Sequence, residues 1–374
     1  MSNRRITRRD FMRDSAAVAA SAAAVAAGVG SAGGLAAAEA NAADEAKKKT
    51  PSYNPDMEYR RLGKTGVWVS AVCLGGHWKR IDKVIAAKGR IDGWSPPESS
   101  ADAAAFHKNR YDVVTRCLEA GINLVDACSG AEIMAYARAL KGRRDKMFMS
   151  FSWYEKESRF PQWRTAKKLL QGLDEALKES GQEHADLWRI SALTKGSDHT
   201  AAEEEEMMQA LATARKQGKA RFTGLSSHDR PWLQKMIEKY PDEMQAVLTP
   251  YTASTTALPT DGLFAALQKQ DVGMLGIKPF ASNSLFKGDS SPASPQAEAD
   301  ARRARLAIRC ILANPAVTAP IPGLISIQQV DNMALAVKEG RKLSGAERAE
   351  LGEALDEMWA NLPQDYEWLR EFKA

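Results

Sequence analysis

The sequence has few cysteines and few histidines, four and five among 374 residues. The cysteines at 73, 117, 128 and 310 form no C-x-x-C pair and no cluster with histidine at zinc spacing, so no metal site is expected. The excess of positive over negative charge is also small. The formal net charge is +5, and residues 1–42, with five Arg and three acidic residues, leave +3 for the rest. Because this charge implies no basic face, nucleic acid is not an expected partner.

Long apolar runs are absent too, apart from a weakly apolar, alanine-dominated run at 16–29 that glycine interrupts. Arg8-Arg9 and Phe11 precede this run, and Ala40-Asn41-Ala42 follows it. This order is typical of a twin-arginine export signal with an A-x-A cleavage site, predicted over 1–42. The alternative is a cytosolic alanine-rich tail. The signal predicts a periplasmic or other extracytoplasmic location. After cleavage no stable membrane span is expected. Export of the already folded protein is compatible with a bound cofactor.

One β-loop-α-loop-β unit organises the interpretation of the chain. Ile122–Val125 is a short apolar strand with Asp126 at its carboxyl end, and a second strand follows at Met147–Phe151. In such units ligands gather at the carboxyl ends of the strands. Asp126 is therefore a candidate functional carboxylate, with helix capping as the alternative.

The alternation of strand and helix then continues along the chain. Strands are predicted at 71–74, 122–125, 147–151, 185–190, 220–225, 245–248, 273–277 and 317–321. Helices are predicted at 111–120, from Pro161, from the capping box at Thr200, and at 231–239, 261–269, 299–313 and 327–338.

Eight such steps predict a (β/α)8 TIM barrel, an α/β fold. Residues 59–70 add an N-terminal β-hairpin, and a capped helix at 344–361 is accessory. The expected organisation is a linker at 43–56, the barrel at 57–340 and a helical extension at 341–374. A polar insertion at 79–103 lies on the loop after strand one, and oligomeric state stays undetermined.

His77 and His228 follow strands one and five, so both are expected at the same barrel mouth as Asp126. They are candidate acid/base groups, although His228 is equally compatible with the start of the next helix. Convergence of the three on a metal has no support from local spacing. Tyr154 and Lys156, just after strand three, are further candidates for an acid and a cation.

Several stretches resemble the aldo/keto reductases. They are Met57 to Gly66, Gly121-Ile122-Asn123, Asp186-Leu187-Trp188, Gly224-Leu225-Ser226 and Ile321-Pro322-Gly323. The resemblance covers roughly 57–340 and implies a TIM barrel, NADPH on its carboxyl face, a small-molecule substrate, and carbonyl reduction by a Tyr acid that Asp, Lys and His support.

Most of that catalytic set is missing. Asp126 matches the family's Asp, but the loop Ala127–Gly130 is shortened and has no Tyr. The family's Lys falls on Ser152 and its His on Ser191, and hydroxyl groups cannot replace a cation that lowers a phenol's pKa. Ordinary carbonyl reduction is therefore not expected.

The resemblance also implies cofactor-binding positions, and these are partly kept. Ser226 matches the residue that holds the nicotinamide carboxamide, Ser227 replaces its Asn partner, and Tyr251 keeps a strand-end aromatic. The loop after strand seven supplies Lys278, Ser282 and Asn283 for phosphate, with pairing to Asp126 as the alternative for Lys278. Gly323, Ser326 and Gln329 follow strand eight, where no Lys or Arg replaces the family's basic residue, so neither NADP nor NAD is favoured.

The resulting expectation is an aldo/keto reductase-like oxidoreductase that binds NADP or NAD and has divergent or lost carbonyl-reductase chemistry. Two alternatives remain open: a non-catalytic binding or scaffold protein on the same barrel, and an acid/base enzyme acting on a sugar or polyol through His77, Asp126 and His228.

Overall fold

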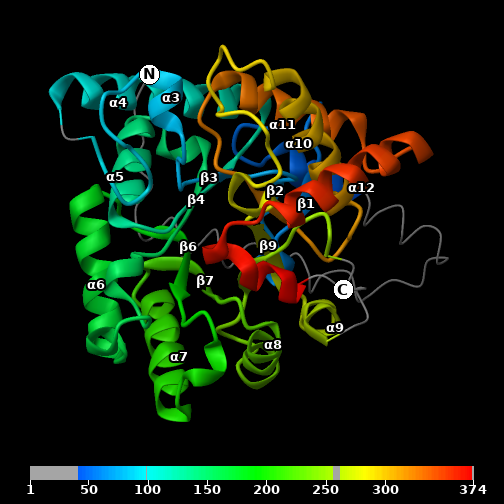
Figure 1. Ribbon diagram of the computed structural model, residues 1–374. Helices are drawn as coiled ribbons and strands as arrows, with labels where there is room; N and C mark the ends of the chain where they lie inside the picture. Colours follow the sequence, from blue (N-terminus) through cyan, green and yellow to red (C-terminus); the bar gives the residue numbers. More distant parts are fainter. Residues whose placement is uncertain (1–40, 98, 256–261, 373–374) are drawn as a thin grey trace.

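The computed structural model describes residues 41–97, 99–255 and 262–372 (Figure 1). The predicted export signal therefore lies, but for its last two residues, outside the described residues. Residues 41–48 are helical, and Thr50 donates a hydrogen bond to the Trp68 carbonyl at 2.6 Å, which ties this segment to the N-terminal hairpin. No helix within the described ranges has the length and apolar character to cross a bilayer.

Eight parallel strands form the predicted barrel. They are β3 (Leu74–Gly75), β4 (Leu124–Ala127), β5 (Phe148–Phe151), β6 (Ala185–Ser191), β7 (Ala220–Ser226), β8 (Ala246–Pro250), β9 (Gly273–Ile277) and β10 (Ala319–Ile321). Each strand pairs with its neighbour in sequence order. Backbone bonds from Cys73 N to Pro320 O (3.0 Å) and from Gly75 N to Pro322 O (2.8 Å) join the first strand to the last.

Helices surround the strands (Figure 1). They are α3 (Ile81–Ile85), α4 (Ser100–Ala120), α5 (Gly130–Ala139), α6 (Ala166–Ser180), α7 (Ala201–Lys216), α8 (Arg230–Lys239), α9 (Gly262–Gln270), α10 (Ala297–Leu312), α11 (Ile327–Glu339) and α12 (Gly345–Ala360). Two helix starts differ from the prediction by more than two residues. The first long helix begins at Ser100 rather than Tyr111, because Ser99 caps it, and α6 begins at Ala166, because Pro161–Trp163 is a separate 3-10 turn.

The barrel interior is apolar toward its amino end, which the hairpin of β1 (Tyr59–Arg61) and β2 (Trp68–Ser70) closes. Leu62 and Val69 of the hairpin join a buried cluster with strand residues such as Leu187 and Leu275. At the hairpin turn, Gly63 has φ +49°, and a Cβ there would lie 2.3 Å from the Gly273 amide nitrogen. Only glycine allows this close approach of hairpin and barrel.

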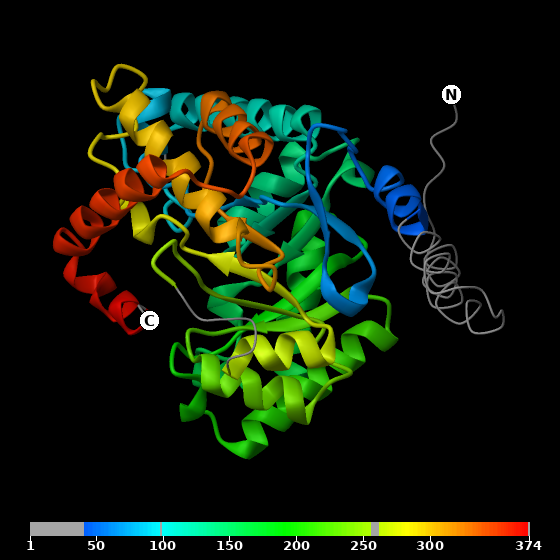
Figure 2. The ribbon, with the colours of Figure 1, turned by 90° about the vertical axis from the view of Figure 1, so that its right-hand side faces the viewer.

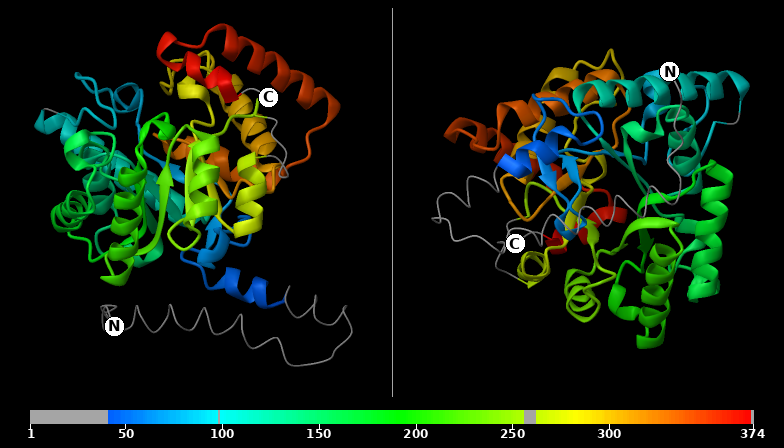
Figure 3. Two further views of the ribbon diagram at one scale, coloured as in Figure 1. Left: turned by 90° about the horizontal axis from the view of Figure 1, so that it is seen from below. Right: turned by 180° about the vertical axis from the view of Figure 1, so that it is seen from behind.

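The C-terminal segment lies at the opposite end of the molecule from the hairpin (Figure 2). After α12 the chain turns back as a 3-10 segment, η7 (Gln364–Phe372), and Arg370 donates to the Trp359 carbonyl at 2.6 Å. Leu369 is fully buried in a cluster that includes Leu306 and Trp359. Figure 3 shows α12 beside the last barrel helices. This packing holds η7 near the carboxyl ends of the strands.

An ionic cluster at the start of β6 makes stability depend on pH. Asp186 is buried and bonds Arg144 at 2.6 Å and Arg221 at 2.9 Å. Burial raises the pKa of Asp186, but the two guanidinium groups outweigh burial and lower it to about 2. A lowered pKa stabilises the fold above the unfolded value near 4, and we expect about 2 kcal/mol to be lost as pH falls from 4 to 2. Urea unfolding at both pH values should show this loss in the wild type and a smaller one in Asp186→Asn.

Candidate active site

A cavity of about 310 Å³ opens at the carboxyl ends of the barrel strands. The three predicted acid/base residues, Asp126, His77 and His228, all line it, and so do Tyr154, Arg189 and Tyr366. A larger hollow of about 1870 Å³ lies outside the barrel, among residues such as Ala46 and Lys141. The smaller cavity is the candidate site, because titratable groups from several strand ends converge there.

Asp126 is buried and forms an ion pair with Arg189 of β6. Its two carboxylate oxygens accept hydrogen bonds from Nε of Arg189 at 2.9 Å and from Nη2 at 2.7 Å, and Ser150 donates at 2.7 Å. Burial lowers the pKa of Arg189, but the Asp126 carboxylate outweighs burial and raises it. The suggested Lys278–Asp126 pair is therefore wrong, and so is helix capping by Asp126, because Ser129 caps α5.

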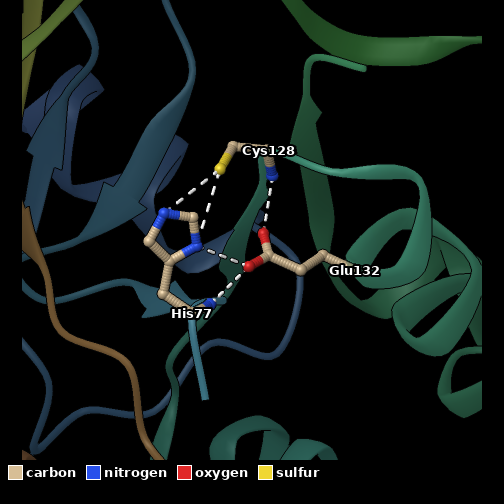
Figure 4. Close-up of side chains that lie close together, drawn as sticks. All are labelled: His77, Cys128 and Glu132. Atoms are coloured by element: carbon tan, nitrogen blue, oxygen red, sulfur yellow. Dashed lines mark hydrogen bonds and ion pairs between the residues drawn. The ribbon is translucent and has the colours of Figure 1, made fainter. Parts of the chain in front are cut away.

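His77 and Cys128, which line the cavity, form a second cluster with the buried Glu132 (Figure 4). His77 Nδ1 lies 2.7 Å from the Glu132 carboxylate, and the thiol sulfur of Cys128 lies 3.6 Å from each ring nitrogen. Burial lowers the pKa of His77, but the charges of Cys128 and Glu132 outweigh burial and raise it. The described residues do not bring His77, Asp126 and His228 together as a metal site. Of these three residues, the cluster contains only His77.

His228 is covered by the C-terminal segment. Its ring stacks on Trp368 of η7, with centroids 4.1 Å apart and planes 17° apart, and its buried Nδ1 has no hydrogen-bond partner within the described ranges. Burial, with the charges of Lys278 and Arg159, lowers the pKa of His228 to about 2. The neutral imidazole can form a hydrogen bond with a ligand but cannot serve as a cationic acid near neutral pH.

A phenol and an ammonium group also meet in the cavity, from segments far apart in sequence. Lys79 Nζ donates to the Tyr366 hydroxyl at 2.8 Å and also bonds the Ser282 hydroxyl. Burial raises the pKa of Tyr366, but Lys79, Ser282 and Lys278 outweigh burial and lower it. The sequence analysis missed this pair and assigned η7 no functional role.

The comparisons with known proteins agree with this architecture. The model of the aldo/keto reductase family matches residues 99–356. The chain belongs to the aldo/keto reductase family. It is 24% identical over 249 residues to L-glyceraldehyde 3-phosphate reductase of Escherichia coli K12, an alignment that covers 63% of this chain and 65% of that protein. It is also 24% identical to L-galactose dehydrogenase of Arabidopsis thaliana, over 76% of this chain and 89% of that protein.

Solved aldo/keto reductases share the fold. The holo form of AKR11C1 from Bacillus halodurans matches with a TM-score of 0.56 at 20% identity, over 80% of this chain and 96% of that one. A Klebsiella pneumoniae aldo-keto reductase in complex with NADPH matches with a TM-score of 0.58 at 18% identity, over 79% and 94%. At these identities the likeness concerns the fold alone.

The two serines at the positions where the resemblance places the family's Lys and His lie side by side. The hydroxyls of Ser152 and Ser191 lie 2.8 Å apart and are buried, and Arg189 Nη1 donates to Ser191 at 3.3 Å. Of the candidates after β5, Tyr154 lines the cavity, whereas Lys156 pairs with Glu175 at 2.7 Å, away from the lining residues. Lys156 therefore does not supply the missing cation in this conformation.

The predicted cofactor residues separate into two groups. Those on the cavity wall are Ser226, Lys278, Ser282, Asn283 and Gly323. The others bond within the protein. Ser227 donates to the Leu193 carbonyl, Tyr251 accepts from Asn314, Ser326 caps α11, and Gln329 accepts from the Ile325 amide. The second group has structural roles and is absent from the cavity lining.

Positive charge dominates the cavity. Lys79, Arg159 and Lys278 line it, and within the described ranges none of them forms an ion pair with a carboxylate. Burial, with Arg159 and Lys79, lowers the pKa of Lys278. Lys278, Ser282 and Asn283 also have left-handed backbone conformations, with φ of 57°, 58° and 72°. Residues with such strained backbone are concentrated at ligand-binding sites. The cavity is suited to an anionic ligand.

Proposed function

We propose that this chain is a nicotinamide-nucleotide-dependent oxidoreductase that interconverts a small hydroxy-carbonyl compound and its alcohol, with Tyr366 in place of the family's catalytic tyrosine. The observation that carries the proposal is the Lys79–Tyr366 pair in the same cavity as Asp126 and Ser226. The relatives named for L-glyceraldehyde 3-phosphate and L-galactose support the substrate class.

The residues on the wall fit a nicotinamide nucleotide. The Ser226 hydroxyl would hold an amide group, and Lys278, Ser282 and Asn283 would bind phosphate through charge and hydroxyl or amide donors. The unpartnered Nδ1 of His228 supplies one more polar contact. The bound nucleotide supplies the hydride. At 310 Å³ the cavity is near the lower end of the range for ligand pockets, about 300–1,000 Å³, so it suits a small substrate beside the nicotinamide end of the nucleotide rather than the whole nucleotide.

The chain's own residues provide the proton. Tyr366 donates it to the carbonyl oxygen of the substrate, and Lys79 stabilises the phenolate that remains. Arg189 and Asp126 form a fixed, neutral pair behind the substrate. The proposed setting is outside the cytoplasm, in keeping with the twin-arginine motif, and the nucleotide would be carried inside the folded protein.

Nucleotide binding tests the proposal. We expect protein lacking residues 1–42 to bind NADPH or NADH saturably in a fluorescence titration. Lys278→Ala should weaken that binding about 10- to 100-fold, because a charge-assisted bond to phosphate contributes about 1.5–3 kcal/mol.

Lys287→Ala is the matched control. Lys287 follows the same loop but is half exposed and pairs with Glu357 at 2.9 Å, so its loss should leave the Kd within twofold. If the wild type binds neither nucleotide, the barrel is a binding or scaffold protein for another ligand, and the proposal is wrong.

A further inference from the structure

The carboxylate of Glu132 has three N–H groups within hydrogen-bond distance of its two oxygens. Its side chain is 1% exposed. One oxygen accepts from the backbone N–H of His77 and lies 2.7 Å from Nδ1 of that ring, and the other accepts from the backbone N–H of Cys128 at 2.7 Å. A carboxylate that accepts three such bonds holds both residues in place and has little capacity left to bind a metal ion.

Two glycines make room for this carboxylate. A Cβ at Gly76 would lie 2.0 Å from the Glu132 carboxyl carbon, and one at Gly93 would lie 2.1 Å from a carboxylate oxygen. Gly93 belongs to the insertion after the first barrel strand. Its carbonyl also accepts a hydrogen bond from the Ser129 hydroxyl. The insertion therefore contributes to a built arrangement around Glu132.

The bond to Glu132 decides which nitrogen of His77 is basic. Because the pKa of His77 is raised, the ring is neutral, and can act as a base, only above that pKa. The neutral ring donates Nδ1–H to the carboxylate and carries its lone pair on Nε2, and the Cys128 sulfur lies 3.6 Å from that atom. Burial raises the pKa of Cys128, so the resting group is a thiol that needs a base. A thiol, a base and a carboxylate that orients the base are the three parts of a nucleophilic site.

We propose that Cys128 is a nucleophilic thiol, with His77 as its base and Glu132 as a positioning residue, that adds to the carbonyl carbon of an aldehyde in the cavity. The thiol proton moves to Nε2 of His77 as the sulfur lone pair forms the C–S bond. The C=O π pair moves to oxygen, which takes the proton back from His77. The product is a hemithioacetal, and no oxidant or reductant is consumed.

The surroundings of Cys128 favour this addition. His77 and Cys128 both line the cavity, together with Arg189 and Lys278, whose positive charges act on the Cys128 sulfur and would stabilise the developing alkoxide. Cys310 offers an internal comparison, because it is also half-buried, but among the described residues it has no histidine partner and its sulfur bonds only the Ala253 carbonyl, at 3.7 Å. The step needs no nicotinamide nucleotide and so stands apart from the proposed oxidoreductase activity.

Alkylation by iodoacetamide, followed residue by residue with peptide mass spectrometry on nucleotide-free protein, tests the proposal. We expect Cys128 to react at least tenfold faster than Cys310. His77→Ala should bring Cys128 down to the rate of Cys310 while leaving Cys310 unchanged, which also reports that the fold is intact. Glu132→Gln should give an intermediate rate.

Glyceraldehyde should protect Cys128 but not Cys310, whereas glycerol, of the same size without a carbonyl, should protect neither. Equal rates at the two cysteines, or equal protection by glycerol, would overturn the proposal. So would one zinc ion per purified chain together with faster alkylation after a chelator, because the thiol would then be a metal ligand. Failure of nucleotide binding would leave the proposal intact, since no nucleotide is present.

Discussion

Tyr366→Phe is expected to lower kcat for reduction of a small aldehyde about 10²- to 10⁴-fold, because the substitution removes the proton donor and keeps the ring. The Kd for nucleotide should change little, since Tyr366 is assigned to the reacting carbonyl and not to phosphate. Steady-state oxidation of NADPH or NADH with glyceraldehyde as substrate measures kcat and KM, and the fluorescence titration gives Kd.

Tyr154→Phe is the matched control for this variant. Tyr154 lines the same cavity, but it packs edge-on against Trp94 at 4.8 Å and Phe160 at 5.6 Å, so its hydroxyl should matter less than threefold. A Tyr366→Phe enzyme that keeps the wild-type kcat would show that the proton comes from another group, with His77 the next candidate.

Lys79 should set the pH range of the reaction through Tyr366. Burial acts to raise the pKa of Tyr366, and the Lys79 charge and hydrogen bond lower it overall. Reduction needs the protonated phenol, so activity is lost as pH rises through the pKa of Tyr366. Lys79→Met should raise that pKa, and the high-pH limb of the kcat profile should move to higher pH.

Strand positions were predictable because the strand pattern is local. All eight predicted strands coincide with observed ones to within a few residues, and β9 matches at both ends. The carboxyl-end rule correctly placed Asp126, His77 and His228 around one cavity. These conclusions needed only runs of apolar residues and the direction in which parallel strands point.

The partners of these residues were not predictable from local pattern. Lys79 and Tyr366 are 287 positions apart, and only the return of η7 across the barrel end brings them together. The partner of Arg189, however, could have been predicted from the strand pattern. Side chains alternate along β6, and Leu187 belongs to the barrel interior, so Arg189 and Ser191 face inward as well. A charged residue in an inward position requires a buried counter-charge, and Asp126 was the available one.

That buried pair gives the largest expected effect on stability. Arg189→Met should lower the free energy of unfolding by about 3–5 kcal/mol, because it leaves the Asp126 carboxylate buried without its cation. The side chains of Arg189 and Asp126 are only 3% and 6% exposed, so water screens the unpaired carboxylate weakly. Urea unfolding at pH 7, followed by circular dichroism, measures the change in midpoint and slope.

Two further variants separate this cost from other effects of losing an arginine. Arg116→Ala removes an exposed pair with Asp331, at 38% and 47% exposure, and should cost no more than about 1 kcal/mol. In the double variant Asp126→Leu, Arg189→Met both charges are gone, and most of the lost stability should return, because apolar side chains of similar volume replace a buried ion pair at little cost. A double variant as unstable as Arg189→Met alone would mean that the guanidinium acts through its bonds to Ser191 and the Ala127 carbonyl rather than through Asp126.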